Sequence, residues 1–234
     1  MDDLARLLAE ARRSGAALAD APRALSLAEG YSVGARVVAL LGTPIGWKIG
    51  ATSAGAMAAL RVSEPIRGRV FADGLLESGA RYKPPGPRPV AAEPEISLYV
   101  GEDGRAVSAR LALEIVRPSR DDALALGAGF IVADNAAHVA VVLGPDLPLA
   151  VLDCPGEVRV TLWVNGEARH SGTAADVLGD PRRALAWLAG AIGPELEPGQ
   201  PVVSGAITRA VELASDDTVV ADFGAFGRVE LTMG

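Results

Sequence analysis

Two glutamates in one apolar stretch, Glu93 and Glu95, have a spacing that could bind a metal ion. Residues 92–100 alternate in polarity and end in β-branched and aromatic residues, a pattern that predicts a strand. Side chains two positions apart on a strand point to the same side, so both carboxylates project from one face. Adjacent carboxylates repel each other, and a hard divalent cation such as Mg²⁺ or Mn²⁺ removes that repulsion. The alternative is a solvated edge strand, and the pair taken alone favours it.

A third carboxylate, Glu114, lies inside the next apolar run, Leu-Glu-Ile-Val. A buried carboxylate without a partner is rare, which makes Glu114 a candidate ligand. The turn signal at 101–104 predicts that the two runs form a hairpin. A simple hairpin about that turn would place Glu95 opposite Arg110 and not opposite Glu114. Glu114 therefore joins the pair only through a bend, a bulge or a neighbouring strand, and the sequence leaves these possibilities open.

The composition excludes several classes of protein. The chain has 234 residues, of which 50% are hydrophobic and 4% aromatic, with a net charge of -7. An acidic chain does not suit nucleic-acid binding, which depends on Lys and Arg neutralising phosphate. The N-terminus lacks the features of a signal peptide, and no apolar run approaches the length that spans a membrane. Cys154, the single cysteine, is expected to be a packed thiol at the end of a buried strand. We expect a soluble cytoplasmic protein without nucleic-acid or membrane partners.

Hydrophobic periodicity places helices first and strands afterwards. Helical spacing covers residues 2–13 and 26–41, and Ser26 followed by Glu29 resembles a capping box. The chain after residue 116 is predicted to be mainly β with one helix, which begins at Asp180-Pro181. Asn165-Gly166 predicts the clearest hairpin turn. The other predicted segments are a short helix at 53–62 and strands at 46–49, 69–73, 92–100, 106–116, 199–207, 211–214, 218–223 and 227–233.

Seven segments, in this order, resemble the 2-keto-4-pentenoate hydratase and 4-oxalocrotonate decarboxylase branch of the fumarylacetoacetate hydrolase superfamily. The resemblance implies an α+β fold, in which a mainly β roll of the fumarylacetoacetate hydrolase C-terminal type lies behind an N-terminal helical segment. It also implies a division into a helical segment at 1–45 and a catalytic domain at 46–234, and a homo-oligomer. The matching segments are Gly46-Trp-Lys-Ile-Gly-Ala-Thr-Ser53, Phe71-Ala-Asp73, Glu93-Pro-Glu95-Ile96, Leu113-Glu-Ile-Val116 with Arg120, Ala133-Asp-Asn135, Ala186-Trp-Leu188 and Ser204-Gly-Ala206.

The resemblance implies roles for individual residues. Glu93, Glu95 and Glu114 match the metal ligands of the family, which bind Mg²⁺ or Mn²⁺. Lys48 and Asp73 match pocket residues that act electrostatically and in proton transfer. From the sequence alone, Lys48 could equally be a surface lysine and Asp73 an ordinary turn residue.

The chain departs from the family pattern at two places. Only a short connection separates the second glutamate from the third, whereas relatives carry a longer insert that includes a helix. In addition, His138 stands where hydratases usually have small and serine residues. Either His138 is a different acid–base group or the substrate has changed. A lone histidine in an apolar run is more often a satisfied core residue than a catalytic one.

The function implied by the resemblance is a metal-dependent hydratase of a 2-hydroxy-2,4-dienoate, of the 2-keto-4-pentenoate type, in aromatic catabolism. The alternatives are a 4-oxalocrotonate-type decarboxylase and a catalytically silent subunit that binds a 2-oxo acid. An acylpyruvate hydrolase ranks lower because such chemistry usually uses a histidine base, and neither His138 nor His170 lies in the N-terminal half. The expected substrate is in each case a small 2-oxo acid or dienoate.

Overall fold

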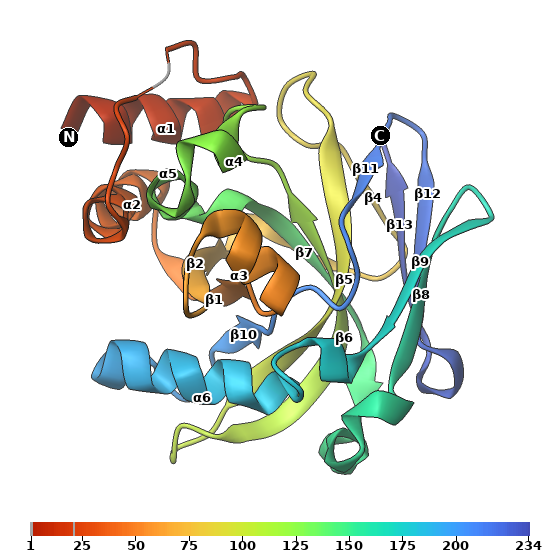
Figure 1. The fold of residues 1–234 in the computed structure, drawn as a ribbon. Helices are drawn as coiled ribbons and strands as arrows, with labels where there is room; N and C mark the ends of the chain where they lie inside the picture. Colours follow the sequence, from red (N-terminus) through yellow and green to blue (C-terminus); the bar gives the residue numbers. More distant parts are fainter. Residues whose placement is uncertain (1, 21) are drawn as a thin grey trace.

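Two β-sheets and six α-helices form the structure, a computed structural model that describes residues 2–20 and 22–234. The N-terminal helices lie at one end of the larger sheet, and the smaller sheet lies at the other end (Figure 1). This arrangement confirms the predicted α+β class. In the part of the chain so described, no helix is both long and apolar enough to cross a lipid bilayer.

The larger sheet has the acidic strands at its centre. Its strand order is β2-β1-β10-β5-β6-β7-β3, and β11 pairs with β5 beyond the end of β10. The β1–β10 and β3–β7 pairs are parallel, and the other neighbours are antiparallel. The strands are β1 Pro44–Gly50, β2 Ile66–Phe71, β3 Leu75–Glu77, β5 Val90–Val100, β6 Ala106–Val116, β7 His138–Leu147, β10 Pro201–Val203 and β11 Val211–Leu213.

The smaller sheet has the order β4-β13-β12-β8-β9. Asn165 and Gly166 join β8 to β9 with φ of 52° and 79°, the left-handed conformations that a tight hairpin turn requires. This confirms the predicted hairpin. The strands are β4 Ala80–Tyr82, β8 Arg159–Val164, β9 Glu167–Thr173, β12 Thr218–Asp222 and β13 Arg228–Met233.

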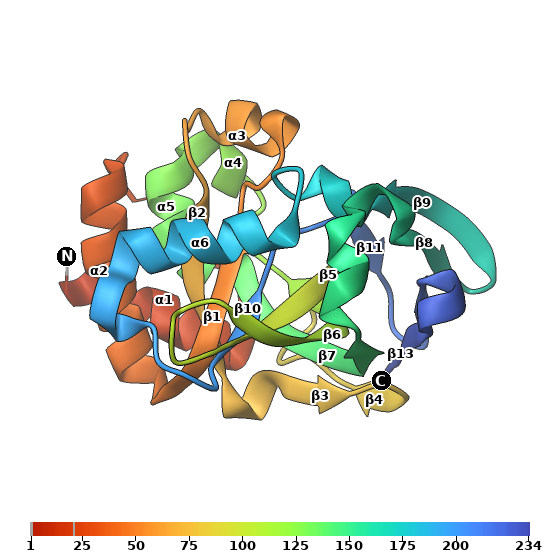
Figure 2. The same ribbon diagram turned by 90° about the horizontal axis from the view of Figure 1, so that it is seen from below.

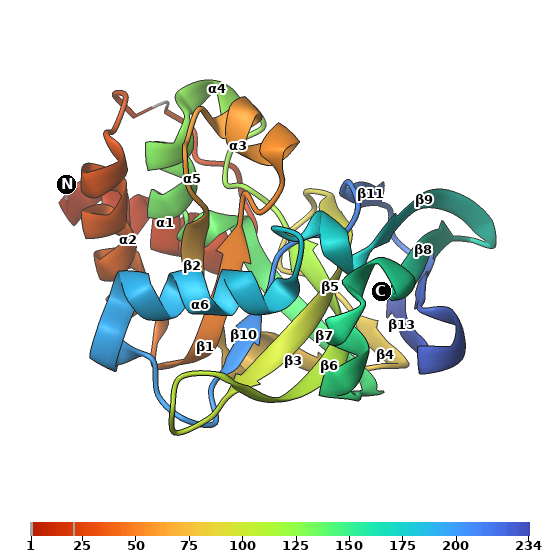
Figure 3. The same cartoon turned by 60° about the horizontal axis from the view of Figure 1, so that its bottom comes forward.

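The main hydrophobic core lies between the two sheets and extends under helix α6 (Pro181–Ile192). The helix begins as predicted, because the Asp180 side chain accepts a hydrogen bond from the Arg182 backbone N–H at 2.8 Å and Pro181 occupies the first turn. Leu185 and Leu188 of α6 are buried against the larger sheet, across which the helix runs in Figures 2 and 3. This packing covers the side of the sheet formed by β1, β10 and β5.

A second core joins the N-terminal helices to α5 (Ala128–Ala133). Helix α1 (Asp2–Ser14) contributes Leu8, and α2 (Leu27–Leu41) contributes Val33 and Val37. The predicted capping box is present in α2: the Glu29 N–H donates to the Ser26 side chain, and the Ser26 N–H donates to the Glu29 carboxylate. The helical segment therefore shares its core with residues that follow the acidic hairpin.

Three sequence predictions about local structure are wrong. The apolar run before Asp134 is the helix α5, preceded by the short helix α4 (Ala123–Leu126), so the second half contains more than one helix. Of the strand predicted at 199–207, only β10 is present. The residues after it form a loop, which makes hydrogen bonds to β5. Cys154 is exposed between two 3₁₀ turns and does not end a buried strand. In the first two cases contacts distant in the sequence outweigh the local apolar pattern. The predicted helix at 53–62 is present as α3 (Ala54–Leu60).

The contact between α2 and α5 predicts a stability effect. A Cβ added at Gly30 would lie 2.2 Å from the Gly129 carbonyl oxygen, so the Gly30→Ala variant requires backbone movement. We expect Gly30→Ala to destabilise the protein by about 1–3 kcal/mol, measured as a lower urea midpoint. Gly190→Ala is the matched control, since it lies in α6 with no atom within 4 Å of the added Cβ. An unchanged midpoint for Gly30→Ala would show that the two helices are not tightly packed.

Candidate metal centre

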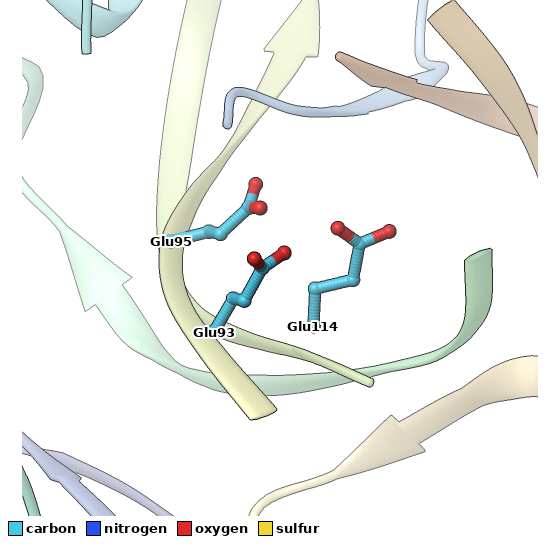
Figure 4. Close-up of side chains that lie close together, drawn as sticks. All are labelled: Glu93, Glu95 and Glu114. Carbon is cyan, nitrogen blue, oxygen red and sulfur yellow. The ribbon is translucent and has the colours of Figure 1, made fainter. Parts of the chain in front are cut away.

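Three glutamates converge on one face of the β5–β6 hairpin. Glu93 and Glu114 are directly opposite in the antiparallel register, and Glu95 follows two residues along, opposite Ala112. One carboxylate oxygen from each of the three lies within 4.8 Å of the others. Figure 4 shows the three side chains pointing toward a common space. Glu95 and Glu114 are fully buried and Glu93 is partly buried, so the structure does not show a solvated edge strand.

A bulge near the hairpin turn sets this register. Val100 pairs with Ala106 whereas Tyr99 pairs with Ser108, so Val107 is an extra residue on β6. The register consequently places Ser97 opposite Arg110, and it brings Glu114 opposite Glu93. Of the three possibilities that the sequence left open, the structure has the bulge. It supplies one residue of the shift from the simple hairpin, and the turn, in which Gly101 bonds to Arg105, supplies the other.

Lys48 and His138 contact Glu114 from two sides. Lys48 Nζ lies 3.1 Å from Glu114 Oε2, and it donates a hydrogen bond to the Ala136 carbonyl oxygen at 3.0 Å. His138 Nδ1 lies 2.7 Å from Glu114 Oε1. Because a carboxylate can only accept, the proton of this bond is on Nδ1 of His138. Lys48 and His138 are both buried, so neither is a surface residue.

Burial shifts two of the carboxylates toward the protonated form. Burial raises the pKa of Glu93 to about 7, with the Glu114 charge adding to the effect and Lys48 opposing it. Burial and the Glu114 charge also raise the pKa of Glu95 well above its usual range. A metal ion that binds here would displace these protons, because carboxylate ligands must be deprotonated to bind a metal.

The charge on Glu114 is retained. Burial disfavours its ionised form, but the Lys48 charge and the His138 hydrogen bond outweigh burial and lower the pKa of Glu114. Burial likewise disfavours the Lys48 cation, and the three glutamates outweigh it and raise the pKa of Lys48. Burial lowers the pKa of His138, against the opposing effect of Glu114. The protein therefore holds a Lys48–Glu114 ion pair beside a neutral imidazole.

Backbone groups that the sequence did not reveal complete the site. The Gly205 N–H donates to Glu95 Oε2 at 2.7 Å. The carbonyl that receives Lys48 belongs to a turn in which Asn135, Ala136 and Ala137 all have left-handed φ, of 51°, 51° and 62°. Such backbone is strained for residues other than glycine and persists only where its surroundings fix it.

Asn135 and Asp134 fix this turn. The Asn135 side chain accepts from the Arg69 N–H at 2.7 Å and donates to the Arg69 carbonyl at 2.9 Å. Asp134, which is buried, accepts from the Ser119 hydroxyl and from Arg12, which forms a 3.0 Å ion pair with it. The Ala-Asp-Asn segment noted in the sequence thus positions the carbonyl that holds Lys48.

The predicted catalytic residues line two cavities. Lys48, Glu93 and Glu95 line a cavity of about 680 Å³, whereas Asp73 and His138 line a neighbouring cavity of about 370 Å³. The structure does not bring Asp73 to the cavity of Lys48. Lys48 pairs with Gly68, from which β2 continues by roughly 10 Å before it ends and the chain turns to Asp73. Asp73 is exposed, and within the described residues it has no hydrogen-bond or ion-pair partner.

The donor set fits a hard divalent cation. All three ligand groups are carboxylate oxygens, the type that Mg²⁺ and Mn²⁺ prefer. Glu114 Oε2, although near Lys48, accepts no hydrogen bond of good geometry within the described residues, so it retains lone pairs for an ion. Glu93, Glu95 and Glu114 can therefore hold a metal ion together.

A family model and several named proteins match this chain. The family model described as fumarylacetoacetate (FAA) hydrolase C-terminal matches residues 75–233. A 4-oxalocrotonate decarboxylase of Pseudomonas sp is 33% identical over 72% of this chain and 70% of that protein. A 2-keto-4-pentenoate hydratase of Burkholderia vietnamiensis is 31% identical over 80% of this chain and 77% of that protein. A 2-oxo-hept-4-ene-1,7-dioate hydratase of Escherichia coli is 35% identical, but the match spans only 42% of this chain and 38% of that protein.

Solved structures share the fold. The 4-oxalocrotonate decarboxylase from Pseudomonas putida G7, complexed with magnesium and adipate, has a TM-score of 0.88 and 22% identity, covering 100% of this chain and 97% of that chain. A fumarylpyruvate hydrolase from Pseudomonas aeruginosa, in complex with Mn²⁺ and pyruvate, has a TM-score of 0.60 and 15% identity, over 80% of this chain and 88% of that chain. The chain belongs to the fumarylacetoacetate hydrolase C-terminal family.

Proposed function

We propose that this chain is a metal-dependent lyase that hydrates a 2-hydroxy-2,4-dienoate of the 2-keto-4-pentenoate type in aromatic catabolism. The observation that carries the proposal is the convergence of three carboxylates beside Lys48, a buried and protonated lysine that lines one cavity with Glu93 and Glu95. The relative named 2-keto-4-pentenoate hydratase, at 31% identity, supports the choice of substrate. The homo-oligomer and the cytoplasmic location remain predictions from the sequence.

Glu93, Glu95 and Glu114 would hold the Mg²⁺ or Mn²⁺ ion. When bound, such an ion supplies Lewis-acid polarisation of the carboxylate and ketone oxygens of a 2-oxo acid. Gly205 keeps Glu95 oriented through its 2.7 Å hydrogen bond, and His138 does the same for Glu114. In this proposal His138 is a positioning residue.

Lys48 would stabilise the charge that develops on the substrate. Its ammonium group has three N–H donors. One donates to the Ala136 carbonyl and another faces Glu114, so a third can donate to a ligand in the cavity. Because the surrounding carboxylates keep it protonated, Lys48 suits electrostatic stabilisation and proton donation rather than proton abstraction. The proton-transfer role of Asp73 stays a prediction from the resemblance, since Asp73 lines the neighbouring cavity.

A second candidate function is decarboxylation of a 4-oxalocrotonate-type acid. The relative named 4-oxalocrotonate decarboxylase, which is 33% identical over most of the chain, favours it. Both reactions need the same enolate stabilisation, so the glutamates and Lys48 would serve either. A silent 2-oxo-acid-binding subunit would bind the metal and the ligand without turnover.

The function is tested with purified protein, Mg²⁺ and 2-hydroxypenta-2,4-dienoate. We expect the dienol absorbance to decay without release of carbon dioxide and the activity to be lost on chelation of the metal. Glu95→Gln should lower the Mg²⁺ affinity, measured by calorimetry, by more than about tenfold, whereas Glu212→Gln, an exposed change on β11, should not. Release of carbon dioxide from 4-oxalocrotonate, without turnover of the dienoate, would favour the decarboxylase. Bound metal without turnover of either compound would favour the silent subunit.

Metal binding should strengthen as the pH rises. The pKa of Glu93 is about 7 and that of Glu95 is raised, so below these values protons occupy the ligand atoms and must be released. We expect the Mg²⁺ affinity to rise between pH 6 and pH 8, by up to about tenfold per pH unit for each proton released. Calorimetry in buffers of different ionisation enthalpy measures the protons directly. An affinity that is flat over this range would contradict the raised pKa values.

Removal of the Lys48 cation should impair turnover more than binding. For Lys48→Met we expect kcat to fall by about 100-fold, because the charge that stabilises the developing oxyanion is lost. Arg105→Met, a change at an exposed cationic residue outside both cavities, is the control. Circular dichroism checks that both variants fold. A Lys48→Met enzyme with wild-type kcat would eliminate Lys48 as a catalytic residue.

A further inference from the structure

A strand of the smaller sheet, β9, forms part of the wall of the 680 Å³ cavity. The Ile207 N–H donates at 2.9 Å to the carbonyl of Pro94, the residue between the two glutamates of β5. A Cβ added at Gly172 of β9 would lie only 2.6 Å from the Ile207 carbonyl oxygen, so the two backbones are in close contact. A single residue, Ile207, therefore separates β9 from the strand that carries two of the three glutamates.

His170 brings an imidazole to this cavity from β9. It lies two residues before Gly172, so the two residues face the same side of the strand, about 7 Å apart. That side is the inner one, because His170 pairs with Leu162 of β8, which is buried in the core between the two sheets. His170 is nevertheless exposed, and it lines the cavity together with Lys48 and the two glutamates of β5.

The other titratable side chains that line this cavity are unsuited to accept a proton. Lys48 is kept protonated by the carboxylates around it, and the two glutamates of β5 would be occupied by the ion. Asp176 caps a 3₁₀ turn, where its carboxylate accepts from the Thr173 N–H at 2.7 Å. Arg209 carries a guanidinium, which is not deprotonated in proteins. Among the described residues that line the cavity, this leaves the imidazole on β9.

The two histidines of the chain differ in how their rings are bonded. His138 is bonded to Glu114, whereas the His170 ring makes no hydrogen bond or ion pair with any residue that the structure describes. Imidazole is the side chain most often used for proton transfer near neutral pH. Water is a weak nucleophile, and its addition to a conjugated ketone is accelerated when a base removes its proton. His170 has the chemistry and the freedom for that task.

We propose that His170 is the general base for the addition of water to a 2-oxo-3-enoate, the ketone form of the dienoate. As the water oxygen bonds to C4, one proton of the water moves to a ring nitrogen of His170. The electron pair of the C3–C4 double bond forms the C2–C3 double bond of an enolate, whose oxygen bears the charge that Lys48 stabilises. His170 then returns the proton to C3 and becomes neutral again. The inference rests on the proposed function, since it assigns a step of that hydration.

The test follows the hydration of 2-oxopent-3-enoate by the Mg²⁺-loaded protein, with the product 4-hydroxy-2-oxopentanoate measured by NMR. We expect His170→Gln to lower kcat by about 100-fold, because the proton acceptor is lost. The Mg²⁺ affinity should stay unchanged, since His170 is not one of the three converging ligand groups. Arg169→Gln, at an exposed neighbour on β9 that does not line the cavity, is the matched control and should keep the wild-type kcat.

Chemical rescue distinguishes proton transfer from a structural role. His170→Ala leaves space at an exposed position of the cavity wall, where imidazole from solution can enter. We expect added imidazole to raise the hydration rate of His170→Ala by about tenfold or more and to leave the wild-type rate unchanged. A side chain that only supported the fold would not be replaced by a free base in this way.

The outcomes separate this inference from the proposed function. A wild type that hydrates the ketone, together with an unchanged kcat in His170→Gln, would overturn the role of His170 alone. A loss of rate that imidazole does not restore in His170→Ala would do the same. Absence of hydration by the Mg²⁺-loaded wild type would overturn the proposed function and this inference with it. Because His170 is exposed on the edge strand of its sheet, its variants should fold as the wild type does, which circular dichroism checks.

Discussion

The mutual repulsion of three carboxylates in a buried space is the constraint on which the rest of the site depends. Glu93, Glu95 and Glu114 lie closer together than unpaired charges tolerate away from water. The protein meets this cost without an ion by keeping one glutamate charged against Lys48 and by raising the pKa values of the other two. A divalent cation would replace the protons, so the arrangement is at once costly for the fold and well suited to binding a metal.

Lys48 links this charge cluster to the backbone around it. It pairs with Glu114 and holds the carbonyl of Ala136 in a turn with three consecutive left-handed residues. Asn135 fixes the same turn to β2 by bonding both backbone groups of Arg69. Strain of this kind is found where a backbone group must occupy one position. The turn therefore belongs to the machinery that orients the lysine, although none of its side chains reaches the glutamates.

The long β5–β6 hairpin makes the connection between Glu95 and Glu114 short. The strands are eleven residues each and are joined directly by the turn at 101–105, without an intervening helix. The turn at 101–105 and the bulge at Val107 each shift the register by one residue from that of a simple hairpin, so that Glu114 meets Glu93. A one-residue insertion near the turn changes the pairing partner of every residue further along the strand. A bulge distant from the metal centre therefore determines which residue of β6 lies opposite Glu93.

The sequence by itself determined the features that depend on neighbouring residues. The period of a strand placed Glu93 and Glu95 on one face, the Ser26 and Glu29 pair predicted the start of α2, Asn165-Gly166 predicted a hairpin, and Asp180-Pro181 predicted the start of α6. Each rests on geometry within a few residues, where local preferences are strong.

Only the tertiary structure decided which distant groups meet. The register of Glu114, the placing of Asp73 in the cavity next to that of Lys48, and the loop that brings Gly205 to β5 all depend on contacts between segments far apart in the chain. The helix at 128–133 also belongs to this group, since its apolar run fits a strand equally well until it packs against α2. The physical reason is that a short apolar run or a lone charged residue is compatible with several local structures, and burial against particular partners selects among them.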